Sequence, residues 1–143
     1  MQHSIINYIF AGAAGLSITF SVNDVAHEVI GAATPPPIEG SATMPETVVA
    51  GETYLVDWLL NKRTACPGGN SRVWNGADGF HLTEQEKPTS LPSDGVLRSY
   101  SIPTKIPEYA PSGALALSIE AWYQCPGSER VSVTLGPVYT VVE

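Results

Sequence analysis

Histidine is the side chain best suited to proton transfer near neutral pH, and this sequence has three histidines. Only His81 lies in the expected sandwich, where Asp78 and any of several serines could complete a Ser-His-Asp arrangement. The Gly-x-Ser-x-Gly turn that presents a nucleophilic serine in many hydrolases does not occur in the sequence. We therefore predict that His81 is an outward-facing strand residue and that the protein is not an enzyme.

Two groups of oxygen-bearing side chains could do other chemistry. Glu84 and Glu86 would share one face of a strand, where paired carboxylates can act as acid and base. A solvated turn is the simpler interpretation of this pair. Loop oxygens could also hold a calcium ion, but the candidates Asn75, Asp78 and Asp94 lack the alternating acidic pattern of a calcium-binding loop. We expect no metal ion and no cofactor.

An aromatic contact surface is the remaining candidate site, because Trp and Tyr are enriched at binding hot spots. Trp122 alternates away from the apolar face of its expected strand, so we predict that it is exposed. Trp74, next to an Asn-Gly turn, is the second candidate for surface contact, whereas Trp58 and Tyr123 are expected in the core. The partner would be a protein surface or, alternatively, a carbohydrate ring.

These side chains must be positioned by strands, because residues 45–143 have the pattern of an all-β domain. Short apolar runs are separated by Gly and Pro turns about every ten residues. The clearest alternation runs from 114 to 125. Asn75-Gly76 predicts a two-residue hairpin turn, and Gly136-Pro137 predicts a break before the last strand. About seven strands in roughly 100 residues predict one antiparallel two-sheet sandwich.

The two cysteines fit this arrangement. Cys66 and Cys125 each follow a strand and each precede Pro-Gly, which most simply indicates a disulfide between two strand-end turns. A disulfide implies an oxidising compartment or an extracellular particle. Two reduced, buried thiols are the alternative, and no nearby histidine completes a zinc ligand set. The basic residues near the cysteines, which predict a small basic spot, are Lys62, Arg63, Arg72 and Arg130.

The composition excludes several classes of protein. The 143 residues include 7 Lys plus Arg and 14 Asp plus Glu, which gives a net charge of −7, and the first basic residue is Lys62. A sequence-independent nucleic-acid binder needs a basic face, so we expect no nucleic-acid partner. The 43% hydrophobic content is too high for a disordered chain.

The first segment, residues 1–33, is expected to be a hydrophobic α-helix. Residues 5–22 carry no charge, and as a helix they would span roughly 27 Å, close to the thickness of a bilayer core. Three interpretations stay open: a membrane anchor, a helix buried among protein subunits, and a signal peptide that lacks a basic start. The apolar anchor or assembly residues are Ile5, Ile6, Ile9, Phe10, Leu16, Ile18, Phe20 and Val22.

A proline-rich linker is expected between this helix and the sandwich. Residues 34–44 read TPPPIEGSATM, and consecutive prolines favour an extended polyproline conformation that acts as a semi-rigid spacer. The linker would hold the sandwich away from whatever surrounds the helix.

Several short motifs between residues 36 and 143 resemble immunoglobulin-like β-sandwich domains. They are Gly51-Glu52-Thr53-Tyr54, Arg63 before Cys66, Ile106-Pro107, Pro111 to Gly113, and Trp122-Tyr123-Gln124-Cys125-Pro126. More narrowly, the chain is similar to small phage and bacterial proteins that carry one hydrophobic N-terminal helix and one such sandwich. The resemblance implies a fold and a layout rather than a reaction.

Together these features predict a non-enzymatic structural or binding protein. It would be a virion decoration or minor structural protein held by its N-terminal segment, or a type II membrane-anchored envelope protein with a periplasmic or extracellular sandwich. We expect its partners to be protein subunits of a larger assembly, including copies of itself, with a membrane or a glycan as alternatives. Its location would be a virion or the cell envelope.

Overall fold

The computed structural model describes residues 35–143. The predicted N-terminal helix and its apolar anchor residues lie outside the described residues. Within 35–143, no helix combines the length and the apolar character needed to cross a bilayer.

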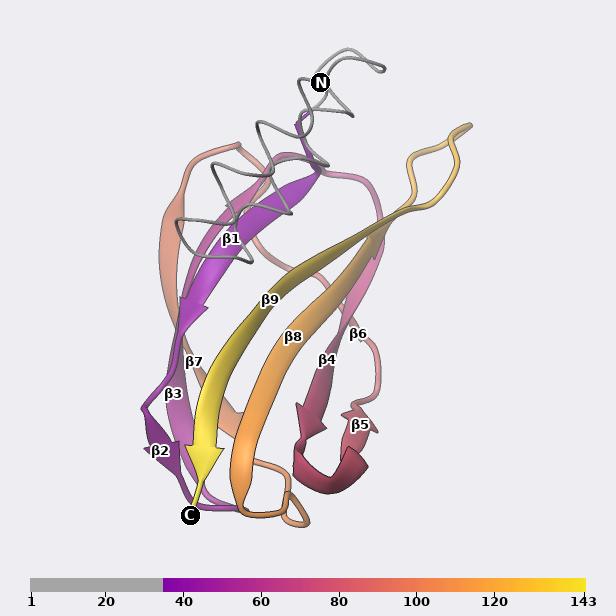
Figure 1. The fold of residues 1–143 in the computed structure, drawn as a ribbon. Coiled ribbons are helices and arrows are strands. Elements are labelled where there is room, and N and C mark those ends of the chain that lie inside the picture. Colours follow the sequence, from indigo (N-terminus) through magenta and orange to yellow (C-terminus); the bar gives the residue numbers. More distant parts are fainter. Residues whose placement is uncertain (1–34) are drawn as a thin grey trace, which may run out of the picture. The chain divides into compact units, whose positions relative to one another are not determined.

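The described residues form two β-sheets that face each other, which confirms the prediction of a mainly β fold (Figure 1). The smaller sheet is antiparallel, in the order β1-β3-β7. The larger sheet has the order β2-β9-β8-β4-β5, with β6 also paired to β4 and β2 parallel to β9. The strands are β1 Ile38–Thr43, β2 Thr47–Val48, β3 Thr53–Lys62, β4 Gly68–Gly76, β5 His81–Thr83, β6 Lys87–Pro88, β7 Arg98–Lys105, β8 Gly113–Tyr123 and β9 Val131–Val142.

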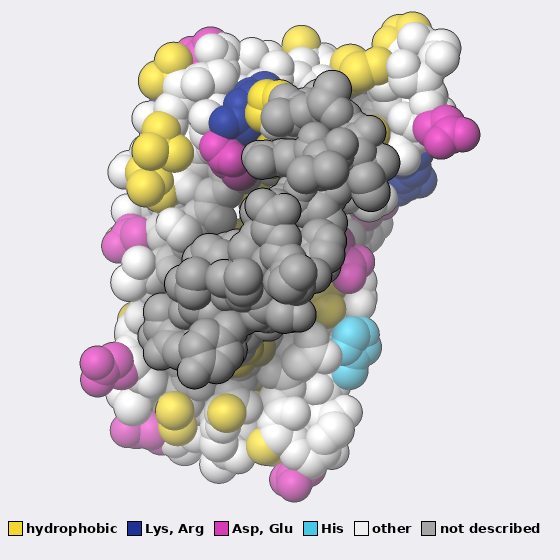
Figure 2. All heavy atoms as spheres, turned by 45° about the horizontal axis from the view of Figure 1, so that its top comes forward, with side chains coloured by type: hydrophobic (Ala, Val, Ile, Leu, Met, Phe, Trp, Pro, Cys, Tyr) yellow, Lys and Arg dark blue, Asp and Glu magenta, His cyan; other side chains and the backbone are white. Residues whose placement is uncertain are grey.

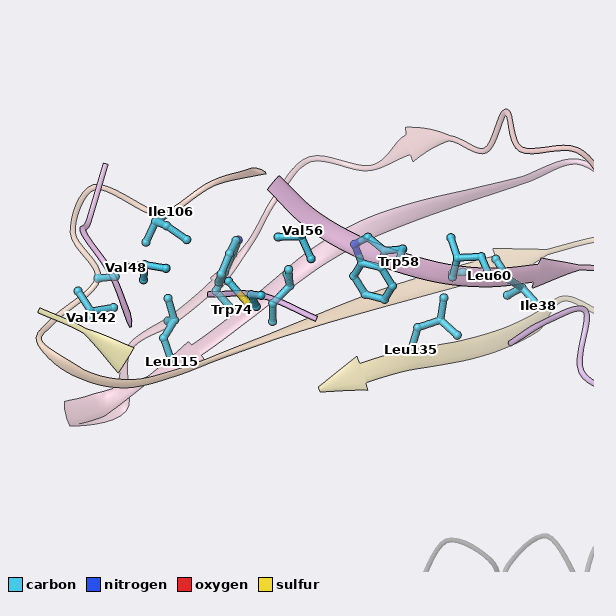
Figure 3. Packing of buried hydrophobic residues seen from close by; sticks show 14 of the residues in the cluster. Ile38, Val48, Val56, Trp58, Leu60, Trp74, Ile106, Leu115, Leu135 and Val142 are labelled. Carbon is cyan, nitrogen blue, oxygen red and sulfur yellow. The ribbon is translucent and has the colours of Figure 1, made fainter. Parts of the chain in front are cut away.

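The core lies between the inner faces of the two sheets (Figure 3). In β3, Val56, Trp58 and Leu60 are buried, whereas the alternate residues Leu55 and Leu59 are 59% and 40% exposed. Strand β8 follows the same two-residue period, with every second side chain from Leu115 to Tyr123 turned inwards. The alternation read from the sequence and the core positions of Trp58 and Tyr123 are therefore confirmed.

The prediction that residues 34–44 form a linker is wrong for residues 38–44. Residues 38–43 are strand β1, which pairs antiparallel with β3, and Ile38 (3% exposed) and Met44 belong to the core. The three prolines predicted a linker, but the strand begins directly after them, and Gly40 within it is needed for close packing. A side-chain carbon at Gly40 would lie 2.3 Å from the backbone oxygen of Leu59. The folded domain therefore begins before residue 45.

The hairpin between β4 and β5 forms, but the predicted two-residue turn is wrong. Asn75 pairs with His81, so Asn75-Gly76 stays inside β4. The chain reverses just after it, through the short 3-10 helix η1 (Ala77–Gly79). Asp78 and Gly79 both have positive φ there, 55° and 74°, and Asp and Gly tolerate this conformation well.

Strand β9 runs without interruption through Gly136-Pro137, so the predicted break is wrong. These two residues lie opposite the single residue Ser118 of β8, which makes a β-bulge. Because of the extra residue, Leu135 before the bulge and Thr140 after it are both buried. Gly136 has a φ of 96°, which explains why a glycine stands here.

Candidate functional site

One end of the domain is held together by a disulfide. Cys66, in the connection from β3 to β4, is bonded to Cys125, in the hairpin between β8 and β9, with the two Cα atoms 4.9 Å apart. The backbone N–H of Gln124 also donates a hydrogen bond to the oxygen of Pro67, at 2.9 Å. The predicted pairing is confirmed, and the two connections form one covalently joined surface.

Beside this disulfide, Trp122 lies on the outer face of the larger sheet, as its alternation predicted, but it is half-buried and not exposed. The guanidinium carbon of Arg130 lies 3.9 Å from the centre of the Trp122 ring, which is a cation–π contact. Trp122 and Glu86 approach each other over Gly69. A side-chain carbon at Gly69 would lie 3.0 Å from the indole nitrogen of Trp122 and 2.8 Å from Glu86 Oε1. The Trp122 ring therefore packs over Gly69 of β4, and the Trp122–Arg130 pair lies next to the disulfide.

The prediction that Trp74 contributes to a contact surface is wrong. Trp74 is fully buried, and its indole N–H donates a hydrogen bond of 2.6 Å to Glu84 Oε2. The prediction depended on a turn at Asn75-Gly76. Because β4 continues past that point, Trp74 pairs with Leu117 of β8 and shares its inward orientation.

The predicted basic spot is divided among separate contacts. Lys62 is buried and donates a 3.2 Å hydrogen bond to the backbone oxygen of Leu91, with its ammonium 5.7 Å from the centre of the Tyr123 ring. Arg72 pairs with Glu84 at 3.6 Å. The two side chains therefore stabilise the fold, and their charges are not displayed together with Arg130.

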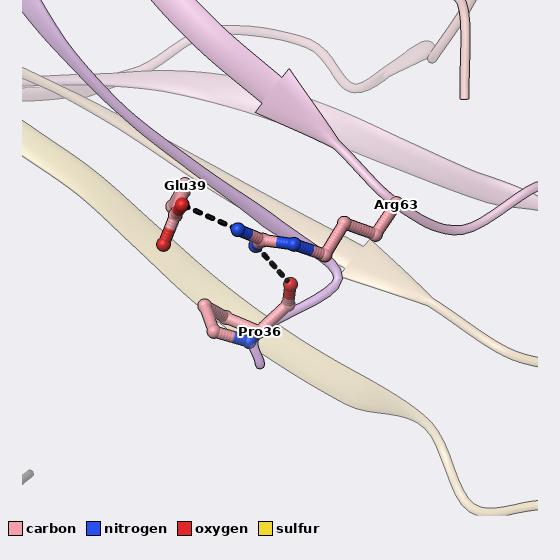
Figure 4. Close-up of polar contacts among 3 residues, drawn as sticks. All are labelled: Pro36, Glu39 and Arg63. Atoms are coloured by element: carbon pink, nitrogen blue, oxygen red, sulfur yellow. Dashed lines mark hydrogen bonds and ion pairs between the residues drawn. The ribbon is translucent and has the colours of Figure 1, made fainter. Parts of the chain in front are cut away.

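Arg63 fixes the point at which the chain enters the domain (Figure 4). Its Nη1 donates to the backbone oxygen of Pro36 at 3.0 Å, and its Nη2 donates to Glu39 Oε1 at 2.5 Å. Its backbone N–H donates to the oxygen of Pro37 at 2.8 Å. These three bonds, which we call the Arg63 clamp, join the start of β1 to the end of β3. The sequence offered no signal for it, because the partners are more than twenty positions apart.

The titratable residues considered for catalysis are not assembled into one site. His81 is exposed, as predicted, and its Nδ1 lies 2.7 Å from Asn75 Oδ1. Asp94 is bonded to Arg98, which lowers the pKa of the Asp94 carboxyl. Among residues 35–143, no three His, Cys, Asp or Glu side chains lie close enough together to hold a metal ion. Figure 2 shows acidic side chains standing apart on the face that it presents.

The outer face of the larger sheet holds a second feature, which the sequence did not single out. A shallow depression of about 420 Å³ lies over β8, between Tyr139 of β9 and Asn75 of β4. Its floor includes Ala116 and Ser118. The outward residues of β8 alternate with its core leucines. The small size of Ala114, Ala116 and Ser118 was the signal in the sequence that could have predicted a depression.

Burial of Tyr123 predicts a loss of stability at alkaline pH. Burial raises the pKa of the Tyr123 phenol above its usual 10.0. The folded state therefore holds this proton more tightly than the unfolded chain, and the resulting stabilisation is complete below pH 10.0 and is lost as pH rises through the folded pKa. In urea unfolding, we expect Tyr123→Phe to weaken the alkaline decline and Tyr109→Phe, at a position 87% exposed, to leave it unchanged. Equal declines in both variants would contradict the assignment.

No protein-family model matches the chain, and no curated protein matches it. Three features of the described residues bear on function. They are the disulfide-joined end with its Trp122–Arg130 pair, the Arg63 clamp, and the depression on the outer face of the larger sheet.

Proposed function

We propose that this chain is a non-enzymatic structural or binding protein that displays one immunoglobulin-like domain from a larger particle. In the version that we favour, the particle is a virion, and the N-terminal apolar segment assembles with neighbouring protein subunits. The sandwich then presents the disulfide-joined end and its sheet faces to partners.

The strand order supports an immunoglobulin-like topology. In such domains the first, second and fifth strands share one sheet, and the third strand lies beside the last two in the other. Here β1, β3 and β7 share the smaller sheet, and β4, β8 and β9 are consecutive in the larger one, with β8 in the middle. The short strand β2 leaves the first sheet and pairs with β9, so β1 and β2 act as two parts of one first strand.

The observation that carries the proposal of display is the Arg63 clamp. Arg63 holds the carbonyl oxygens of Pro36 and Pro37 and the carboxylate of Glu39, so the first residues of the domain are fixed to β3. If the domain is joined to a particle through its N-terminal side, fixing its first residues limits how far it can rotate relative to its attachment. Less orientational freedom of the domain is then lost when a partner binds.

The Trp122–Arg130 pair supports a role in protein contact. Trp and Arg are the residue types that most often dominate binding energy. The pair lies next to the Cys66–Cys125 bond, which limits the motion of both adjoining connections. Stacking on Trp122 also limits the conformations of the Arg130 fork, which favours recognition of a carboxylate on a partner.

Co-sedimentation in the source organism tests the proposal. We expect the full chain to sediment with particles when detergent is present, and we expect a variant without residues 1–33 to stay in the supernatant as a folded, disulfide-bonded protein. A full chain that remains in the supernatant, or a truncated chain that still sediments, would contradict display through the N-terminal segment.

A membrane-anchored envelope protein is the second candidate. It is favoured by the 18 uncharged residues 5–22 and by the disulfide, which is compatible with an extracytoplasmic location. The same experiment separates the two candidates, because detergent would release an anchored chain and would leave a particle-bound chain in the pellet.

A further inference from the structure

The outward side of β8 is a row of small side chains. Leu115 and Leu117 point into the core with 1% exposure each. Their neighbours Ala114, Ala116 and Ser118 therefore point away from it, on the outer face of the larger sheet. A row of such small side chains lets another surface approach the backbone of the sheet closely.

Taller residues flank this row on both sides. Ala116 pairs across the sheet with Asn75 of β4 and with Tyr139 of β9. The small side chain of Ala116 therefore lies between two larger ones. Ala116 lines the 420 Å³ depression. Tyr139 stands beside it with 60% of its surface exposed, and Val141 next to it is 46% exposed. An exposed aromatic ring and a depression thus lie side by side on one face.

This face carries little charge although the chain is acidic. The net charge is −7, which opposes association between copies. Among the outward positions of β8 and β9, however, Glu120 is the one charged residue, and it lies beyond Ser118, away from the centre of the depression. Two copies that meet on this face bring few like charges together.

We propose that a second copy of this chain packs on this face, with Tyr139 of each copy over Ala116 of the other. A two-fold axis between the two residues would place each ring in the partner's depression, which is the reciprocal contact that symmetric dimers require. Sheets pack face to face at a separation of about 10 Å, and small residues such as Ala116 leave room for the Tyr139 ring within it. This inference concerns the sandwich alone and does not depend on the proposed function.

The association should be weak and should strengthen with salt. Three neighbouring strands offer a contact at the small end of specific interfaces. Because the copies repel each other through charges outside the contact, salt screens the repulsion and favours the dimer. A contact made through Arg130 and a carboxylate would weaken with salt instead.

Sedimentation velocity of the full chain tests the inference. The measurement is made in a non-ionic detergent, so that the apolar segment 5–22 does not itself drive association. We expect a monomer–dimer equilibrium that shifts towards dimer as salt rises. Ala116→Arg should raise the dissociation constant at least about tenfold, because the interface would have to desolvate an unpaired charge.

Two further variants make the result decisive. Tyr139→Ser removes the projecting ring at an exposed position, where folding is little affected, and should weaken the dimer as Ala116→Arg does. Leu55→Arg places the same charge on the outer face of the other sheet, at a position 59% exposed, and should leave the dissociation constant unchanged. A chain that stays monomeric, or a dimer that Ala116→Arg and Tyr139→Ser do not weaken, would overturn the inference.

Discussion

We expect Trp74→Ala to lower the free energy of unfolding by about 3–5 kcal/mol, the usual cost of truncating a fully buried tryptophan to alanine. Trp74 has no exposed surface, and its loss would open a cavity within the core cluster of both sheets. It would also leave Glu84 without the 2.6 Å hydrogen bond from the indole. Urea unfolding followed by far-ultraviolet circular dichroism measures the effect.

Two other substitutions separate the causes. Trp74→Phe keeps most of the packing but removes the donor to Glu84, so it should cost about 1–3 kcal/mol. Trp122→Ala removes a half-buried ring on the outer face and its contact with Arg130, so it should cost less than half as much as Trp74→Ala. If both alanine variants unfolded at the same urea concentration, the placement of Trp74 in the core would be contradicted.

Removing the disulfide should have a comparable effect. Cys66 and Cys125 are 59 positions apart, and a bridge that closes a loop of this length stabilises the folded state by about 4 kcal/mol in the chain-entropy model. The double variant Cys66→Ser, Cys125→Ser should lose that amount in urea unfolding. The total stability of a domain of this size is typically about 5–15 kcal/mol, so the remaining margin would be small.

Reductant provides the matched control for this prediction. It should shift the unfolding midpoint of the original chain to that of the double variant and should leave the double variant itself unchanged. If strong reductant under unfolding conditions left the unfolding midpoint of the original chain unchanged, the disulfide would not contribute to stability.

Much of the sheet architecture could be predicted because it depends on local alternation. The two-residue period of β3 and β8 correctly assigned Trp58 and Tyr123 to the core. Strand β1 escaped the same reasoning. Ile38 in β1 and Met44 just after it are buried, but Gly40 between them is required by a backbone contact with β3 that leaves no pattern in the sequence.

The candidate site was less predictable because its contacts join distant parts of the chain. Arg63 and Arg130 lie near the two cysteines in the sequence, but their partners Pro36, Glu39 and Trp122 could not be assigned from spacing. Trp74 was misplaced for a different reason. A strong Asn-Gly turn signal was overridden by pairing of Asn75 with His81, which extended the strand and changed what surrounds the indole.

The parallel pairing of β2 with β9 also determines how the domain would respond to mechanical load. Backbone bonds from Val141 to Glu46 and from Glu143 to Val48, each 3.0 Å, join the two strands, and the hydroxyl of Thr140 adds a 2.6 Å bond to Pro45. Tension between the start of β2 and the end of β9 runs along these strands, so it shears the bonds together instead of peeling them apart one at a time. A domain pulled between these two points would therefore yield abruptly under tension rather than fray.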